Sequence, residues 1–188
     1  MDAPRRWQRT ALPAHVKEMP MSERSQDKAG AHRRLITRLE QQAEDVRRLT
    51  AGLDDEQLSR RTVPAKWSLK ELVCHLGRIQ DVFDARVAAM VGQEQPAIAS
   101  YEPEDDPDFE GLTRRPASAC LQDFFSGRDR LFARLEALGP EQWHRSGRHP
   151  EYPNYDVHFA VEYMAHHEAH HIYQMYQRRA PLGRLPHH

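Results

Sequence analysis

Apolar residues recur every three or four positions in four long segments of the chain, and this spacing predicts four amphipathic helices. The segments run from His32 to Leu53, from Ser68 to about Met90, from about Ala117 to Leu138 and from about Val157 to Arg179. Polar and charged residues fill the positions between the apolar ones. No run alternates apolar and polar residues in the way that a half-buried strand does. The pattern therefore predicts an all-α protein.

The clearest helix start lies at the beginning of the second segment. Ser68 can accept a hydrogen bond from the first turn, and Glu71 stands where it can complete a capping box. Trp67 precedes the cap and can pack on Leu72. Pro64 ends any regular structure before this point. The second helix is therefore predicted to begin at Ser68.

The connections between the helices differ in length. Residues 54–58 predict a short helical turn, and residues 144–154 are turn-rich, with Asp156 or Asn154 as the cap of the last helix. Residues 93–116 hold four prolines and a cluster of acids, which is typical of a long surface connection and can also form a lid. We therefore expect a four-helix bundle with a long crossover connection between the second and third helices.

The chain of 188 residues is predicted to form one domain with two terminal extensions. Residues 1–28 lack a sustained apolar period and are interpreted as an extended N-terminal arm. Residues 29–182 form the bundle domain, and residues 183–188 form a C-terminal tail. Met21 begins a stretch that resembles an alternative start, so residues 1–20 are either a packing arm or an overlong gene model.

Composition and charge exclude several classes of function. Lys and Arg number 27 and Asp and Glu number 28, so the net charge of −1 offers no footprint for nucleic acid or an anionic membrane surface. No apolar run is long enough to span a bilayer. Cys74 and Cys120 show neither a disulfide framework nor metal-binding spacing, which favours a reducing, cytoplasmic location.

The chain contains 12 histidines, and several of them gather in the fourth predicted helix. His166 with His170, and His167 with His171, are spaced so that either pair can hold one ion from adjacent turns. On a helical wheel, His167 and His171 lie at the border of the apolar side, whereas the other pair turns to the opposite surface. The inward pair is therefore His167 and His171.

The second helix supplies a candidate third ligand. His75 lies one turn after Leu72 and one turn before Ile79, at the edge of the same buried stripe. Three neutral imidazoles suit a divalent ion and leave positions open for water or substrate. A histidine at a helix border is more often an ordinary polar residue, and a histidine-rich helix can simply be solvated. Spacing alone therefore leaves both interpretations open.

Three other residues of the fourth helix are candidates for supporting roles. Gln174 can orient His171 or a water molecule, Tyr163 can donate to a bound substrate, and Glu168 can act as a base. Each has an ordinary alternative, namely a border polar residue, a packed aromatic ring and an exposed carboxylate. His149 lies in a predicted surface loop and can line the mouth of the site.

Three separated motifs resemble the DinB/YfiT-like superfamily of four-helix metalloproteins. They are GLDDEQL at residues 52–58, KWSLKELVCHL at residues 66–76 and HEAHHIYQ at residues 167–174, and the resemblance covers roughly residues 30–180. It implies a divalent ion, commonly zinc or nickel, bound by His75, His167 and His171. The N-terminal arm and the acidic connection at residues 102–110 depart from many members of the superfamily.

The resemblance also implies a range of activities. The superfamily contains S-transferases and isomerases that use low-molecular-weight thiols, together with members described as hydrolases. We expect a metal-dependent enzyme that transfers a small thiol to an electrophile, because the sequence shows no dedicated base for activating water. The alternatives are a metal-dependent hydrolase and a non-catalytic metal-binding bundle of a stress response. A homodimer is expected, and neither nucleic acid nor a membrane is expected as a partner.

Overall fold

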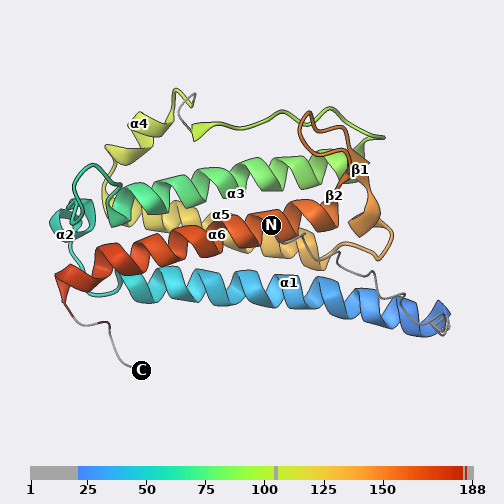
Figure 1. Ribbon diagram of the computed structural model, residues 1–188, viewed down its shortest axis with the longest axis horizontal. Coiled ribbons are helices and arrows are strands. Elements are labelled where there is room, and N and C mark those ends of the chain that lie inside the picture. Colours follow the sequence, from blue (N-terminus) through green and yellow to red (C-terminus); the bar gives the residue numbers. More distant parts are fainter. Residues whose placement is uncertain (1–20, 104–105, 184, 186–188) are drawn as a thin grey trace, which may run out of the picture.

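The computed structural model describes residues 21–103, 106–183 and 185. Four long helices form a bundle, as predicted (Figure 1). They are α1 (Met21–Thr50), α3 (Leu69–Gly92), α5 (Ala117–Glu136) and α6 (Val157–Arg179). The shorter elements are α2 (Asp55–Ser59), α4 (Phe109–Thr113), η2 (Gln142–His144), β1 (Ser146–Gly147), β2 (Tyr155–Asp156) and η3 (Ala180–Leu182). None of the helices in the described residues is long and apolar enough to cross a membrane.

The long helices do not follow simple up-and-down order. Gln80 of α3 bonds the carbonyl of Phe124, and Asp84, further along α3, pairs with Arg134, further along α5, so α3 and α5 are parallel. His75 lies beside His171, whereas Phe83 packs on Tyr163, so α3 and α6 are antiparallel. Because α3 and α5 run in the same direction, the chain between them returns along the bundle (Figure 1). The predicted crossover is confirmed.

Local capping explains where α3 and α6 begin. Ser68 accepts a hydrogen bond from the backbone N–H of Glu71, whose carboxylate accepts one from the N–H of Ser68 at 2.7 Å. This is the predicted capping box at the start of α3. Asp156 caps α6 by accepting a hydrogen bond from the N–H of Phe159 at 2.8 Å. Both caps fix the register of the histidines that follow.

Some boundaries differ from those predicted. The helix α1 begins at Met21, earlier than His32, so residues 21–28 are helical rather than part of an extended arm. Residues 21–31 contain few apolar side chains, and a helix without an apolar stripe leaves no periodic signal. The proposed arm at residues 1–20, and tail residues 184 and 186–188, lie outside the described part of the chain.

Three short elements, β1, β2 and α4, were not predicted. The strands β1 and β2 pair Ser146 with Asp156 and Gly147 with Tyr155, which closes the turn-rich segment before α6. Two-residue strands are too short to show alternation. The crossover connection also contains one short helix, α4, where a continuous loop was expected.

The core is divided by a polar layer across the middle of the bundle. One apolar cluster contains Phe83, Met90 and Leu131, and the other contains Leu72, Phe124 and Met175. Near the boundary between the two clusters lie buried polar side chains, namely Gln42 of α1, His75 and Gln80 of α3, Arg128 of α5, and Glu168 and His171 of α6. Buried polar groups need partners within the protein, so this layer is where chemistry is expected.

Candidate metal centre

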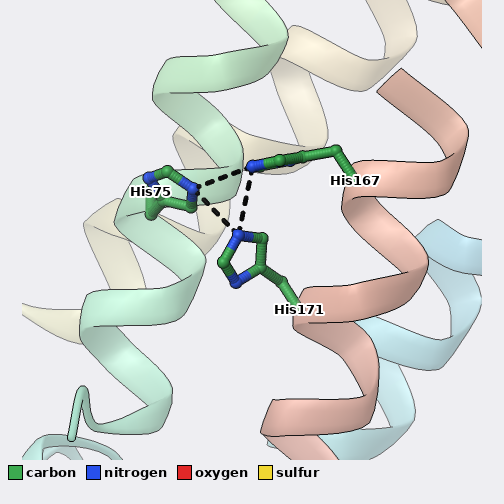
Figure 2. Close-up of side chains that lie close together, drawn as sticks. All are labelled: His75, His167 and His171. Carbon is green, nitrogen blue, oxygen red and sulfur yellow. Dashed lines mark hydrogen bonds between the residues drawn. The ribbon is translucent and has the colours of Figure 1, made fainter. Parts of the chain in front are cut away.

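Three imidazoles meet in the polar layer (Figure 2). The Nε2 atom of His75 lies 3.4 Å from that of His167 and 3.1 Å from that of His171. The Nε2 atoms of His167 and His171 are also 3.1 Å apart. His75 comes from α3 and the other two come from adjacent turns of α6. The structure thus brings together the three residues that the sequence singled out.

The spacing of these nitrogens matches a shared cation. A metal–nitrogen distance of about 2.0–2.1 Å, with angles between about 95° and 109°, places ligand nitrogens about 3.0–3.4 Å apart. All three observed distances are of this size. Of the described residues, these three are the group of His, Cys, Asp and Glu side chains arranged to hold a metal ion. The donor set therefore fits a divalent ion that accepts imidazole.

Burial keeps the three rings neutral. Burial, together with the neighbouring imidazoles, lowers the pKa of His75 to about 3 and that of His167 to about 4. Burial also lowers the pKa of His171. A neutral imidazole has one nitrogen with a free lone pair, which is the form that binds a metal. Each ring can therefore act as a ligand at neutral pH.

Gln174 selects the form of His171 that presents Nε2. Its Oε1 atom lies 3.0 Å from Nδ1 of His171, so Nδ1 carries the proton and donates it, and Nε2 keeps its lone pair. The amide nitrogen of Gln174 donates to Nε2 of His170 at 2.8 Å, which sets the orientation of the amide. The predicted supporting position of Gln174 thus has a geometric basis.

Replacing Gln174 by leucine is expected to weaken metal binding. The Nδ1 atom of His171 then loses its acceptor, and the ring is free to rotate or change tautomer. We expect the metal affinity to fall about 10- to 100-fold, as for other groups that orient metal ligands. Competition with a chromophoric chelator measures this change. Gln177→Leu, at an exposed position of α6, is the matched control, and equal affinities for both variants would contradict the role of Gln174.

Packing holds the ring of His75. The Trp67 ring lies 4.9 Å from it and the Phe109 ring 6.3 Å, measured between centroids. The Nδ1 atoms of His75 and His167 are buried without a hydrogen-bond partner among the described residues. Aromatic contacts, together with Gln174, therefore position the nitrogens. Trp67 thus precedes the helix cap and also supports the site.

Glu168 is engaged in a buried ion pair and is therefore not available as a base. Its carboxylate accepts a hydrogen bond from Arg128 at 2.6 Å, and both side chains are 2% exposed. Burial raises the pKa of Glu168, and Arg128 opposes that shift. Arg128 also donates to Gln80 and to the carbonyl of Leu39. The carboxylate that the sequence offered as a base is thus half of a structural ion pair.

A cavity of about 230 Å³ adjoins His167. It lies between α3 and α6 and is closed by residues of the two long connections. Tyr163, which is 41% exposed, and His149 both line it, so each lies where a substrate could contact it. His75 and His171 are more deeply buried than His167. The cavity is therefore the route from solvent to the imidazoles.

The crossover connection forms one wall of this cavity. Tyr101, Glu102 and Pro103 line it, so part of the acidic segment covers the site as a lid would. Asp106 fastens the segment to α3, because it accepts hydrogen bonds from Arg78 at 2.7 Å and from the Tyr101 hydroxyl at 2.8 Å. The side chain of Asp106 is 1% exposed. Residues 104–105 of the acidic segment lie outside the described residues.

Asp106→Asn is expected to loosen this wall. The variant loses a charge-assisted hydrogen bond of about 1.5–3 kcal/mol, so exchange of the hydrogen-bonded amides at residues 106–109 should speed up by about tenfold or more. Hydrogen exchange followed by mass spectrometry measures this change. Asp108→Asn, at an exposed neighbouring carboxylate, is the control. Unchanged exchange in Asp106→Asn would contradict the role of Asp106 in fastening this segment to α3.

The attachment of this segment through Asp106, Arg78 and Tyr101 is also expected to depend on pH. Burial alone raises the pKa of Asp106, but the hydrogen bonds from Arg78 and Tyr101 outweigh it and lower the pKa below its usual value. A carboxylate with a lowered folded-state pKa stabilises the fold above its unfolded pKa and loses this effect as pH falls through the folded value. Exchange of the hydrogen-bonded amides at residues 106–109, corrected for intrinsic rates, should therefore rise only below about pH 4.

Sequence analysis missed several residues of the cavity. Arg86 lines the cavity from α3, beyond the predicted ligand, and the ion pair of Arg78 with Asp106 fastens the segment that forms its wall. Arg78 and Arg86 are charged residues in a helix that already had an apolar stripe, so they resembled an ordinary solvated face. Helical spacing places Arg78 and Arg86 near the side that carries His75, which was the available signal.

Comparisons with known proteins agree with this architecture. YfiT from Bacillus subtilis, described as a probable metal-dependent hydrolase with an unusual four-helix bundle topology, superposes with a TM-score of 0.68 and 19% identity, over 91% of this chain and 94% of that one. The uncharacterized protein YuaE of Bacillus subtilis (strain 168) is 26% identical over 149 residues, which are 71% of this chain and 90% of YuaE. The family model of the DinB superfamily matches residues 38–175, well over half of the chain. The chain belongs to the DinB superfamily.

Proposed function

We propose that the protein is a divalent-metal-dependent enzyme that transfers a low-molecular-weight thiol to an electrophile. The convergence of three neutral imidazole nitrogens beside a cavity carries this proposal. His75, His167 and His171 would hold the cation, and zinc or nickel suits a set of imidazole ligands. The protein's own groups then bind and orient the substrate in the cavity.

The ligand set determines what the bound ion can do. A cation held by three neutral ligands keeps its full positive charge, so it lowers the pKa of a thiol or a water molecule and polarises a substrate atom. An anionic ligand set would offset part of that charge. His167 borders the cavity and is less buried than the other two histidines, which favours access of substrate over a closed structural site.

The surroundings of the imidazoles favour a thiol over water as the nucleophile. Hydrolysis is usually helped by a carboxylate or histidine that removes a proton from water. Glu168, the carboxylate next to His167 in the sequence, is paired with Arg128. His75, His167 and His171 are themselves needed as ligands. A thiol is already more acidic than water and reacts as thiolate without a separate base.

Hydrolysis is a second candidate function. YfiT, which has the same fold, is described as a probable metal-dependent hydrolase. The cation chemistry that activates a thiol also activates water, so the two reactions require the same ligands. They differ in whether a thiol is consumed. A substrate assay can therefore separate them directly.

The test uses protein freed of metal and then loaded with zinc or nickel. The metal-loaded protein is mixed with 1-chloro-2,4-dinitrobenzene and with glutathione, cysteine or coenzyme A in turn, and thioether formation is followed by absorbance. In the balanced reaction the thiol sulfur replaces chloride on the ring, and the thiol proton leaves with chloride as acid. Ester hydrolysis without a thiol is measured in parallel with 4-nitrophenyl acetate.

We expect a rate that requires both a thiol and the metal and that falls to background in His171→Ala. Thiol-independent ester hydrolysis that requires the metal would favour the hydrolase instead. Tight metal binding without either activity would favour a non-catalytic metal-binding bundle. Either result would overturn the proposed transferase.

A further inference from the structure

Arg86 places a positive charge without an ion-pair partner among the described residues in the wall of the cavity. It is half-buried, and none of the described carboxylates forms an ion pair with it. One terminal nitrogen donates to the Tyr155 hydroxyl at 3.2 Å and the other to the carbonyl of Ala99 at 2.6 Å. A guanidinium has five N–H donors, so these two bonds leave donors unused. The structure therefore holds the cation in place with neutral acceptors.

His149 adds a second donor beside Arg86. Burial and the charge of Arg86 lower the pKa of His149 and outweigh the opposing effect of Glu151, which favours the neutral ring at neutral pH. Its Nδ1 atom accepts a hydrogen bond from the backbone N–H of Glu151 at 3.2 Å, so the proton lies on Nε2. The ring stacks on Tyr155 at 4.7 Å between centroids. Arg86 and His149 thus offer donors at one end of the cavity.

The rest of the cavity wall is largely aromatic. Phe83, Tyr152 and Tyr163 line it together with Tyr101 and Tyr155, and the rings of Phe83 and Tyr163 stack at 6.1 Å. The acids Glu102 and Glu151 also border the cavity, but both are exposed to solvent at its rim. An exposed carboxylate repels an anion weakly because solvent screens it. The inner wall therefore suits a flat apolar group that carries a negative charge.

The dimensions limit the size of the ligand. The cavity follows α3 from Ile79 to Arg86, which is about 10 Å of helix. Its volume of about 230 Å³ lies below the roughly 300–1,000 Å³ of pockets for drug-sized ligands. Ile79 follows His75 by one helical turn, and His167 lines the cavity near Ile79. Arg86 lies at the opposite end of the cavity. One small planar acid can span this distance.

We propose that this cavity binds a small aromatic carboxylate, with its anionic group on Arg86 and His149 and its ring among the aromatic side chains. A carboxylate accepts hydrogen bonds from a guanidinium in a geometry that a neutral group cannot match. The bound acid directs its opposite end toward His167. This assignment of the substrate class rests on the proposed function, in which the cavity leads to the reacting centre.

The test measures binding without turnover. Metal-free protein is titrated with 4-fluorobenzoate and, separately, with the neutral analogue 4-fluorobenzamide, and ¹⁹F NMR reports both dissociation constants. Wild type should bind the carboxylate at least about tenfold more tightly than the amide. In Arg86→Met this preference should disappear, because the carboxylate loses its charged partner. Arg130→Met, at an exposed position of α5 outside the cavity, is the matched control and should keep the preference.

Arg86 also supports Tyr155 and Ala99, so the thermal unfolding of each variant is measured as well. Arg86→Lys is the second variant, since it keeps the charge and loses the planar fork, and it should show a smaller preference than wild type. Equal affinity for the two probes in wild type, no binding of either probe, or a preference that survives in Arg86→Met would each overturn the proposal. Because no metal is present, none of these results bears on whether the histidines bind a cation.

Discussion

His171→Ala is expected to abolish metal-dependent activity and to reduce metal affinity by more than about 100-fold. Three nitrogens converge within 3.4 Å of one another, and removing one leaves two ligands for a cation that three neutral imidazoles hold weakly compared with charged sets. Loss of a group that merely orients a ligand costs about 10- to 100-fold, so loss of a ligand should cost more. Competition titrations and metal content after dialysis measure this effect.

His166→Ala provides the matched control for this experiment. His166 is exposed on the same helix and lies 3.5 Å from Arg38, on the side away from His75. We expect the metal affinity of His166→Ala to equal that of wild type. If His166→Ala lost the metal and His171→Ala retained it, the outward pair of histidines would be the ligands and the proposed centre would be wrong.

Arg128→Met is expected to lower the free energy of unfolding by about 3–5 kcal/mol. The guanidinium lies in the polar layer, with partners on three helices, namely Glu168, Gln80 and the carbonyl of Leu39. Its removal leaves the buried carboxylate of Glu168 without a counter-charge. Urea denaturation followed by circular dichroism measures the change.

The double variant Arg128→Met/Glu168→Gln separates the ion pair from simple packing. Replacing both charges removes the stranded carboxylate, so we expect the double variant to be more stable than Arg128→Met alone. Arg130→Met, where the arginine is exposed on the same helix, should change stability by less than about 1 kcal/mol. A double variant no more stable than Arg128→Met would show that the charge pair does not explain the loss.

The elements that determine the metal centre could be predicted because their signals are local. A capping box at Ser68 and an acidic cap before Val157 define where α3 and α6 begin, and α6 has the predicted bounds. Once both helices are placed, their apolar stripes fix which side of each helix faces the core. His75, His167 and His171 follow from that placement, and the structure brings them together. Their metal binding stays a prediction.

The walls of the cavity could not be predicted, because they come from segments far apart in the sequence. Tyr101 and Glu102 of the crossover meet His149 and Tyr152 of the connection before α6. No periodic pattern specifies how two irregular segments pack on each other. The partner of Glu168 was missed for a related reason, since Arg128 lies on a different helix, α5, and the pairing depends on how α5 and α6 pack within the bundle. Expectations of a dimer and of a thiol substrate likewise remain predictions.

The most direct measurement of the central claim is an anomalous-scattering map of crystals grown from zinc- or nickel-loaded protein. The account predicts one strong peak about 2.0–2.1 Å from the Nε2 atoms of His75, His167 and His171. It also predicts that the remaining coordination positions face the cavity beside Tyr163. A fully loaded protein whose ion lies elsewhere, or loaded crystals without a peak among these three rings, would contradict it.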